Sequence, residues 1–207
     1  LNFTNEGGVG GSTRLLKNNG ALWIYQQMSK AMKRRGREKS WEEMVSAAER
    51  ATPFALLVNP DEPSLVAPDD MIDAVEALAR NTGQTPPNDD GVFYRAALEG
   101  LALRYRACLQ MLESLTEISI ETILIVGGGS LYELLCLMTA DACNRTVVAG
   151  PVEATAIGNV LMQMMGTGAL ESVEAGRTLV RSSFPTTTYK PQDADAWTEP
   201  ARRFAEL

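Results

Sequence analysis

The sequence has no histidine and only three cysteines in 207 residues. Without histidine the chain cannot form a Ser-His-Asp or Cys-His catalytic arrangement, and it has no histidine general base. The cysteines, Cys108, Cys136 and Cys143, are too few and too odd in number for the disulfide framework of a secreted domain. Because Cys136 and Cys143 stand seven positions apart and no histidine is available, the sequence also disfavours a zinc site, and we expect no metal-ligating residues.

Positive charge and long apolar runs are also scarce. Lys and Arg number 19 against 26 Asp and Glu, which gives a net charge of −7 and an isoelectric point near 4.8. Binding to nucleic acid needs a positive footprint, so the sequence disfavours such a partner. No apolar run approaches the roughly 20 residues that cross a bilayer, and no cleavable signal opens the chain. We therefore expect a cytoplasmic protein without membrane partners, made of one ordinary domain or two small ones.

The first half of the sequence predicts mainly helices. The chain begins with Leu1 rather than Met, in a short β-prone stretch, which we interpret as a cut or a missing beginning rather than a natural start. Apolar residues at three- and four-residue spacing then predict helices at 13–35, 41–51, 70–81 and over a long segment that reaches Leu115.

Two further features of this half guide the interpretation. Ser40 and Glu43 form a capping-box pattern at the start of the second helix, and Cys108 falls on the apolar stripe of the long helix as an inert core residue. The apolar run Ala55–Val58 predicts a short buried strand, closed by a turn.

The second half alternates strands and helices. The β-branched run at 122–126 is typical of a central strand buried on both faces. It ends at a Gly-Gly-Gly-Ser loop, and a helix through Leu134 and Ala142 follows. A second strand at 146–149 leads into a helix at 153–165, and the segment after Phe184 is predicted as an irregular surface tail. The order of elements predicts an α/β fold.

Two loops are candidates for chemistry. A strand, a glycine-rich loop and a helix N-terminus together suit a phosphate or ribose, although the loop matches neither the Walker A pattern nor G-x-G-x-x-G, and a plain tight turn is the alternative. After the second strand, the small residues Ala154, Ala156 and Gly158 indicate either a closely packed helix or a helix on which two domains hinge. The residues alone leave both choices open.

Several motifs resemble one known family, and they occur in order over nearly the whole chain. The motifs are Asn2–Gly8, Leu15–Asn18, Ile125–Ser130, Thr139–Cys143 and Ala149–Asn159. Together they resemble the FGGY carbohydrate kinases of the actin/hexokinase/Hsp70 superfamily, specifically the rhamnulokinases among them. The matching part is most of the C-terminal domain of such a kinase.

The resemblance implies a fold and an activity. It implies a ribonuclease-H-like C-terminal domain at 1–184 that lacks its first strands, followed by a wrapping tail at 185–207. Strand 122–126 would then have one unpaired edge. The implied activity is transfer of the γ-phosphoryl group of Mg-ATP to the 1-hydroxyl of L-rhamnulose. ATP, Mg²⁺, a ketose and an N-terminal kinase domain are the implied cofactors and partners.

The resemblance also implies site residues. Gly127, Gly128, Gly129 and Ser130 match the adenosine motif, with Gly128 as the best nucleotide contact, and Gln26 matches another nucleotide position. Asn18 matches a sugar-side position, although a structural role inside the first helix is equally possible. The family's general base, an Asp, and its Ser-Gly-Thr phosphate loop are expected before Leu1. We therefore expect no catalytic residue in this chain, which alone should be inactive.

Other functions stay open at this point. The substrate could be another ketose or a polyol. Alternatively, the chain could be a non-catalytic interaction module that self-associates through the apolar residues Leu131, Tyr132, Met164 and Met165. The family usually has polar residues after the triple glycine, whereas this chain has Leu131 and Tyr132. Leu131 continues the apolar stripe of Leu134 and Met138 and is predicted to be buried. Tyr132 lies off that stripe and is predicted to stack on an adenine or on a partner chain.

Overall fold

The computed structural model describes residues 2–20 and 22–207 and divides the chain into two compact units. Unit 1 comprises the residues up to Ser119 together with Asp195–Leu207, and unit 2 comprises Ile120–Ala194. Leu1 and Ala21, which we placed in the β-prone opening and in the first predicted helix, lie outside the described residues. The predicted division at residue 184 stays a prediction.

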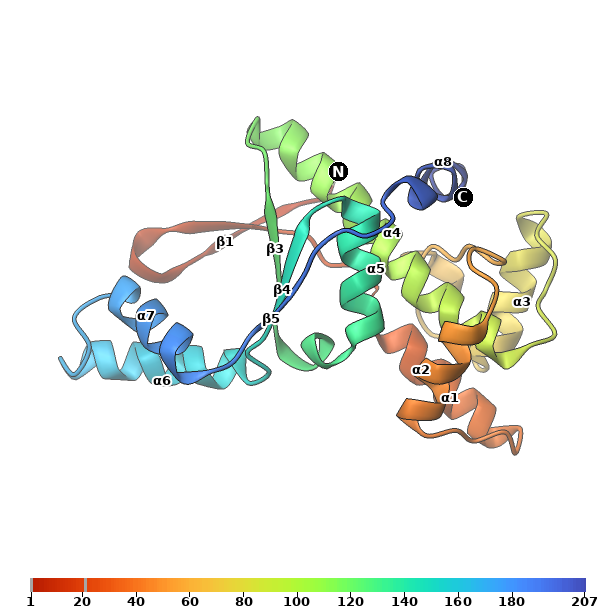
Figure 1. Cartoon of the computed structure of the whole chain (residues 1–207), viewed down its shortest axis with the longest axis horizontal. Helices are drawn as coiled ribbons and strands as arrows, with labels where there is room; N and C mark the ends of the chain where they lie inside the picture. Colours follow the sequence, from red (N-terminus) through yellow and green to blue (C-terminus); the bar gives the residue numbers. More distant parts are fainter. Residues whose placement is uncertain (1, 21) are drawn as a thin grey trace. The chain divides into compact units, whose positions relative to one another are not determined.

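Unit 1 begins with a β-hairpin. Strand β1 (Thr4–Gly7) pairs antiparallel with β2 (Thr13–Leu16), and Thr4 lies opposite Leu16 (Figure 1). The predicted helix at 13–35 is therefore wrong over its first part, because residues 13–16 pair with a strand that local periodicity does not reveal. The helix itself, α1, covers Trp23–Arg34.

Four more α-helices complete unit 1 among its described residues. They are α2 (Trp41–Arg50), α3 (Met71–Asn81), α4 (Asp90–Thr116) and α8 (Thr198–Phe204). Two 3₁₀ turns, η2 (Pro63–Leu65) and η4 (Asp195–Trp197), lie between them. The long α4 packs against α1, α2 and α8. Large apolar side chains fill this core: Met28, Met32, Met44, Ile72, Leu98 and Leu101.

The predicted starts of α2 and α3 are confirmed, and a polar side chain caps each helix. Ser40 and Glu43 form a complete capping box on α2. Asp70 caps α3 by accepting hydrogen bonds from the N–H groups of Ile72 and Asp73. Partial burial opposes ionisation of Asp70, but these N–H groups and Arg35 outweigh it and hold the pKa of Asp70 below its usual range.

In the run Ala55–Val58, the last three residues are buried as predicted, but Ala55 is exposed and the run forms no strand. Its backbone hydrogen bonds go to a side chain, because Leu57 N–H donates to Gln84 Oε1 at 2.8 Å and Gln84 Nε2 donates to the Leu57 carbonyl at 3.0 Å. An amide side chain from the end of α3 thus replaces the neighbouring strand that the prediction required.

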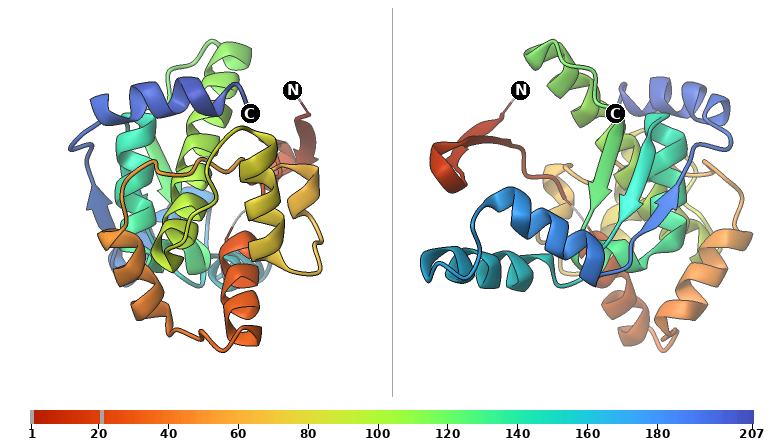
Figure 2. Two further views of the ribbon diagram at one scale, coloured as in Figure 1. Left: turned by 90° about the vertical axis from the view of Figure 1, so that its right-hand side faces the viewer. Right: turned by 60° about the vertical axis from the view of Figure 1, so that its left-hand side comes forward.

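Unit 2 is a three-stranded sheet with helices (Figure 2). Strand β3 (Thr122–Ile125) runs parallel to β4 (Thr146–Ala149), and β5 (Thr187–Tyr189) pairs antiparallel with β4 on its other side. Helix α5 (Glu133–Cys143) packs on the sheet through Cys136 and Ala140. Helices α6 (Ala154–Gly166) and α7 (Val173–Ser183) follow β4.

The sheet corrects two predictions. Strand β3 is an edge strand in the described structure, and Leu124 is 68% exposed, so the expected burial on both faces is wrong whereas the unpaired edge is confirmed. The segment after Phe184 is not irregular, because it contributes β5 to the sheet and α8 to unit 1. Both elements depend on partners far away in sequence, which a local pattern of prolines does not show.

Helix α6 differs from the prediction of close packing. No residue of α6 is buried, and a side chain at Gly158 would meet no described atom within 4 Å. The alternative, a hinge helix between domains, stays a prediction. None of the helices in the described residues is long and apolar enough to cross a membrane.

The three cysteines are buried thiols. The prediction that Cys108 is a core residue of the long helix is confirmed. Burial raises the pKa of Cys136 to about 11, with a further contribution from Glu133. Thiolate is the reactive form of cysteine, so this burial disfavours reaction at Cys136.

Candidate nucleotide and sugar site

The glycine loop of unit 2 joins a second loop at the carboxyl ends of two parallel strands. Gly127 N–H donates to the Pro151 carbonyl at 3.1 Å, and Gly150 N–H donates to the Ile125 carbonyl at 2.8 Å. Ser130 Oγ donates to the Gly127 carbonyl at 2.7 Å and closes the turn. Ligands of open α/β sheets bind at this edge. The structure therefore brings both candidate loops of unit 2 together.

The local backbone depends on glycine and leaves room around it. Gly127 has a φ of 74°, a left-handed conformation that a side chain would strain. Gly128 is exposed, and an added Cβ would meet no described atom within 4 Å. A ligand such as a nucleotide base can therefore approach the backbone of Gly128 closely.

The predicted helix through Leu134 and Ala142 is confirmed as α5, but a short 3₁₀ turn precedes it. Residues Gly127–Leu131 form a 3₁₀ turn, η3, and α5 begins only at Glu133. Leu131 is 70% exposed, so its predicted burial is wrong: it ends the 3₁₀ turn and does not continue the stripe of α5. Tyr132 is half-buried, and burial raises its pKa.

Gln26 and Asn18 belong to unit 1. Gln26 is exposed on α1, one turn after Trp23, which is 40% exposed. Asn18 is an exposed residue of the loop that joins β2 to α1. The alternative role for Asn18 inside a helix is therefore wrong.

Asn18 lines a cavity of about 640 Å³ within unit 1. Its walls combine polar side chains with an aromatic ring and small apolar groups, including Lys17, Asn19, Trp23, Asp61, Val66 and Arg104. Gln26 is not among its lining residues. Such a mixture can hydrogen-bond hydroxyl groups and cover an apolar face of a small polar ligand.

Asp61 and Arg104 were missed by sequence reasoning. Asp61 lies in the turn after the buried run and Arg104 lies in the middle of α4, so neither belongs to a motif. Only the fold places them beside Asn18 in one cavity.

A family model for the FGGY family of carbohydrate kinases, C-terminal domain, matches residues 1–167. The chain belongs to the FGGY family. The predicted α/β fold and the resemblance are both confirmed by this match and by the structure.

Three curated relatives of this chain are rhamnulokinases. The chain is 44% identical to the rhamnulokinase of Bacteroides thetaiotaomicron over 95% of its length, and 39% identical to that of Enterococcus faecalis over 94%. It is 35% identical over 100% of its length to the rhamnulokinase of Pectobacterium carotovorum. The chain covers 40%, 39% and 41% of these relatives, respectively, and thus spans about two fifths of their length.

Solved structures of sugar kinases share the fold. Gluconate kinase from Lactobacillus acidophilus superposes with a TM-score of 0.67 at 12% identity, over 99% of this chain and 41% of that one. Xylulose kinase from Rhodospirillum rubrum superposes with a TM-score of 0.62 at 18% identity, over 88% of this chain and 37% of that one.

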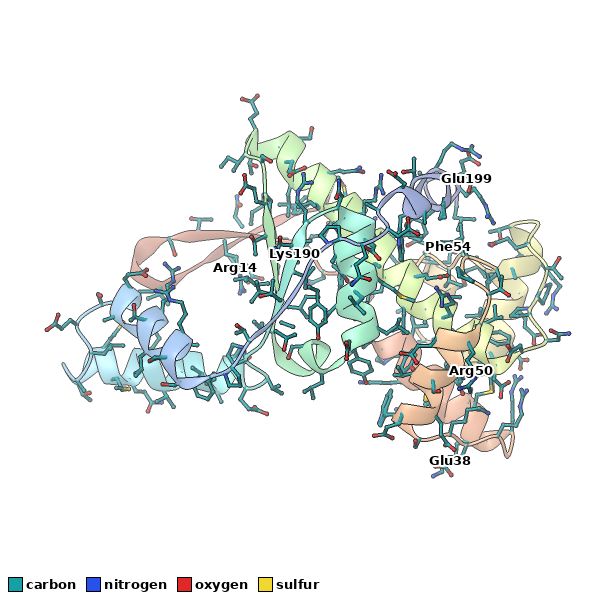
Figure 3. All side chains as sticks on the ribbon, in the orientation of Figure 1. Arg14, Glu38, Arg50, Phe54, Lys190 and Glu199 are labelled. Carbon is teal, nitrogen blue, oxygen red and sulfur yellow. The ribbon has the colours of Figure 1, made fainter. Side chains whose placement is uncertain are left out.

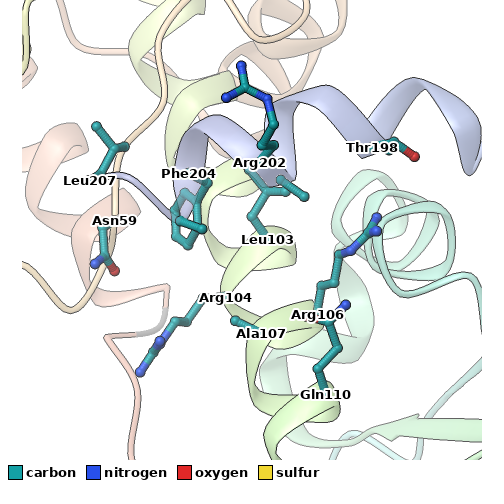
Figure 4. A pocket seen from close by; sticks show the side chains of 12 residues that line it. Asn59, Leu103, Arg104, Arg106, Ala107, Gln110, Thr198, Arg202, Phe204 and Leu207 are labelled. Atoms are coloured by element: carbon teal, nitrogen blue, oxygen red, sulfur yellow. The ribbon is translucent and has the colours of Figure 1, made fainter.

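A second cavity in unit 1 lies apart from the FGGY motifs. It has a volume of about 400 Å³ between α4 and α8, and three arginines line it: Arg104, Arg106 and Arg202 (Figure 4). Arg202 is paired with Glu199 at 3.1 Å and with Glu206 at 2.7 Å on α8 itself. No residue that the family resemblance singles out lines this cavity.

Proposed function

We propose that the chain forms the ATP-side domain of an L-rhamnulose kinase, which transfers the γ-phosphoryl group of Mg-ATP to the sugar 1-hydroxyl. The observation that carries this proposal is the 44% identity to a curated rhamnulokinase over nearly the whole chain. Partners of the domain are then ATP, a ketose and the N-terminal domain of the same kinase. A cytoplasmic location follows from the use of ATP and a metabolic sugar.

The glycine loop fits a nucleotide. In the proposal, Gly127, Gly128, Gly129 and Ser130 hold the adenosine part of the nucleotide. Gln26 on α1 keeps the nucleotide role that its match to the family motif implies. The open space at Gly128 and the left-handed backbone at Gly127 support close approach of the nucleotide to the backbone of the loop. The nucleotide supplies the phosphoryl group that is transferred.

In the proposal, Asn18 contacts the sugar. Its amide can donate to one hydroxyl and accept from another, and it lines a cavity with other polar side chains. The aromatic face of Trp23 in the same cavity supports a ligand with both polar and apolar surfaces.

The remaining chemistry is assigned outside this chain. Among the described residues, no group of three or more cysteines and carboxylates could hold a metal ion. In the proposal, Mg²⁺ binds the nucleotide phosphates, and the general base is the Asp that the family resemblance implies, in the complete enzyme outside these 207 residues. Phosphoryl transfer depends mainly on positioning and electrostatics, which such an enzyme would complete.

The proposal is tested on the complete enzyme with Mg-ATP and three acceptors: L-rhamnulose, D-xylulose and glycerol. We expect kcat/KM to be at least about tenfold higher for L-rhamnulose than for the others. A preference for D-xylulose or glycerol would instead support an FGGY kinase for another ketose or a polyol.

A second candidate is a non-catalytic module that associates through apolar surface. The 70% exposure of Leu131 favours it, whereas Tyr132, Met164 and Met165 are half-buried. Light scattering after size-exclusion chromatography tests this candidate on the complete protein. A monomer at all concentrations, together with sugar-dependent ATP consumption, would remove it.

A further inference from the structure

A carboxylate links the loop that carries Asn18 to the rest of unit 1. Gly20 N–H donates a hydrogen bond of 2.5 Å to Oδ1 of Asp61. The other oxygen, Oδ2, lies 2.6 Å from Nε of Arg104 in α4. Asp61 thus connects the loop before α1 to the centre of the longest helix.

Asp61 is itself held in place. Its N–H donates to Asn59 Oδ1 at 3.1 Å, which fixes the turn in which it lies. The side chains of Asp61 and Arg104 are only 24% and 18% exposed. A partly buried ion pair of this kind is screened less than a surface pair, and loss of one partner leaves the other charge poorly solvated.

Two further contacts restrict the loop on either side of the carboxylate. A side chain at Gly20 would overlap the carbonyl oxygen of Pro60, so the backbone passes close to the turn that carries Asp61. Asn19 Oδ1 accepts a hydrogen bond of 3.3 Å from the Cys108 thiol on α4. The two residues that follow Asn18 are therefore both anchored, while Asn18 itself is exposed toward the cavity.

We propose that Asp61 and Arg104 are positioning residues that hold Asn18 for the sugar. This inference rests on the proposed function, because it takes Asn18 as a sugar-side residue. Asp61 and Arg104 line the same cavity as Asn18, so the anchor and the ligand surface form one unit. Loss of the anchor should therefore weaken sugar binding more than nucleotide binding.

The test uses the complete enzyme and calorimetric dissociation constants for L-rhamnulose and for a non-hydrolysable ATP analogue. Asp61→Ala is expected to weaken L-rhamnulose binding by about tenfold or more, and binding of the ATP analogue by less than about threefold. Asp61→Asn keeps an acceptor for Gly20 N–H but loses the charge beside Arg104, so its effect should be smaller. Arg104→Gln should weaken sugar binding in the same direction.

Asp73→Ala is the matched control. Asp73 is also paired with an arginine in unit 1, Arg35 at 2.7 Å, but it does not line the cavity. Both dissociation constants should be unchanged in this variant. Amide hydrogen exchange at Gly20 should be faster in Asp61→Ala, which loses the acceptor, and unchanged in the control. This measurement tests the anchor independently of turnover.

The outcomes separate this inference from the proposed function. A folded Asp61→Ala enzyme with unchanged sugar affinity, while Asn18→Ala loses affinity, would overturn the positioning role alone. If neither variant changes sugar affinity, or if the wild type does not bind L-rhamnulose, both the sugar-side site and its anchor are wrong. Should Asp61→Ala fail to fold, Arg104→Gln decides: unchanged sugar affinity in this folded variant would overturn the inference.

Discussion

Gly128 and Asn18 are the two residues on which the proposed ligand contacts mainly rest, and both are exposed. Sequence motifs identified both residues, because the chemistry of glycine-rich loops and amide side chains can be recognised without knowledge of the fold. The residues that surround them could not be identified in this way. Asp61 is 43 positions from Asn18 and 43 from Arg104, and only tertiary contacts join the three.

At Gly128 we predict a loss of nucleotide affinity without loss of folding. Since an added side chain meets no described atom of the chain, Gly128→Val should fold normally but occupy the space of the ligand. ATP affinity of the complete enzyme should fall by at least about tenfold, about 1.4 kcal/mol. Calorimetry measures this, with Gly166→Val, at another open glycine of unit 2, as control. Unchanged affinity would remove the loop from the site.

At Asn18 we predict a selective effect on the sugar. Asn18→Ala removes a donor and an acceptor from the cavity, so the KM for L-rhamnulose should rise more than the KM for ATP. Steady-state kinetics of the complete enzyme measure both values. Asn81→Ala, at an exposed asparagine of α3 outside that cavity, is the control. A larger rise for ATP would place Asn18 on the nucleotide side.

At the scale of elements, α4 contains a buried carboxylate that ties a loop to it. Glu99 is 1% exposed, accepts from Arg95 Nε at 2.6 Å, and accepts from Phe54 N–H at 3.0 Å. Phe54, labelled in Figure 3, packs edge-to-face on Trp197 with ring centroids 4.9 Å apart. Burial raises the pKa of Glu99 to about 7, although Arg95 and the Phe54 N–H oppose this.

This carboxylate predicts a pH dependence of stability. Between pH 4.5 and 7 the folded chain binds a proton on Glu99 that the unfolded chain has released, so the free energy of unfolding should fall as pH rises. The decrease should be on the order of 3 kcal/mol and complete once pH exceeds the folded pKa. Denaturant unfolding at several pH values measures it. Glu99→Gln should flatten this part of the curve; an equal slope in both proteins would contradict the assignment.

Elements were predictable to the extent that local signals define them. The capping box at Ser40 and the cap at Asp70 predicted two helix starts, because a capping side chain bonds to the free N–H groups at the start of its own helix. The hairpin at 4–16 and strand β5 were missed, since each needs a partner strand that periodicity does not identify. The run 55–58 has strand-like composition, but the backbone N–H and carbonyl of its Leu57 bond to the side chain of Gln84.

For the whole molecule, we predict that the 207 residues alone do not phosphorylate sugar. The chain spans about two fifths of its curated relatives, and no residue in it is proposed as the general base. Mg-ATP and L-rhamnulose with the purified chain should give ATP consumption equal to that of its Gly128→Val variant. Rhamnulose phosphorylation above that level would show that a base and a phosphate site lie within this chain.

The sequence by itself determined the family, the α/β class, most helix positions and the residue types of the glycine loop, because these depend on local patterns and motifs. Only the tertiary structure decided that β3 is an edge strand with Leu124 exposed, and that the C-terminal segment supplies β5 and α8. It alone placed Asp61 between Gly20 and Arg104. The physical reason is that burial, strand pairing and ion pairing depend on contacts between segments that lie far apart in the sequence. A local sequence pattern does not determine these contacts.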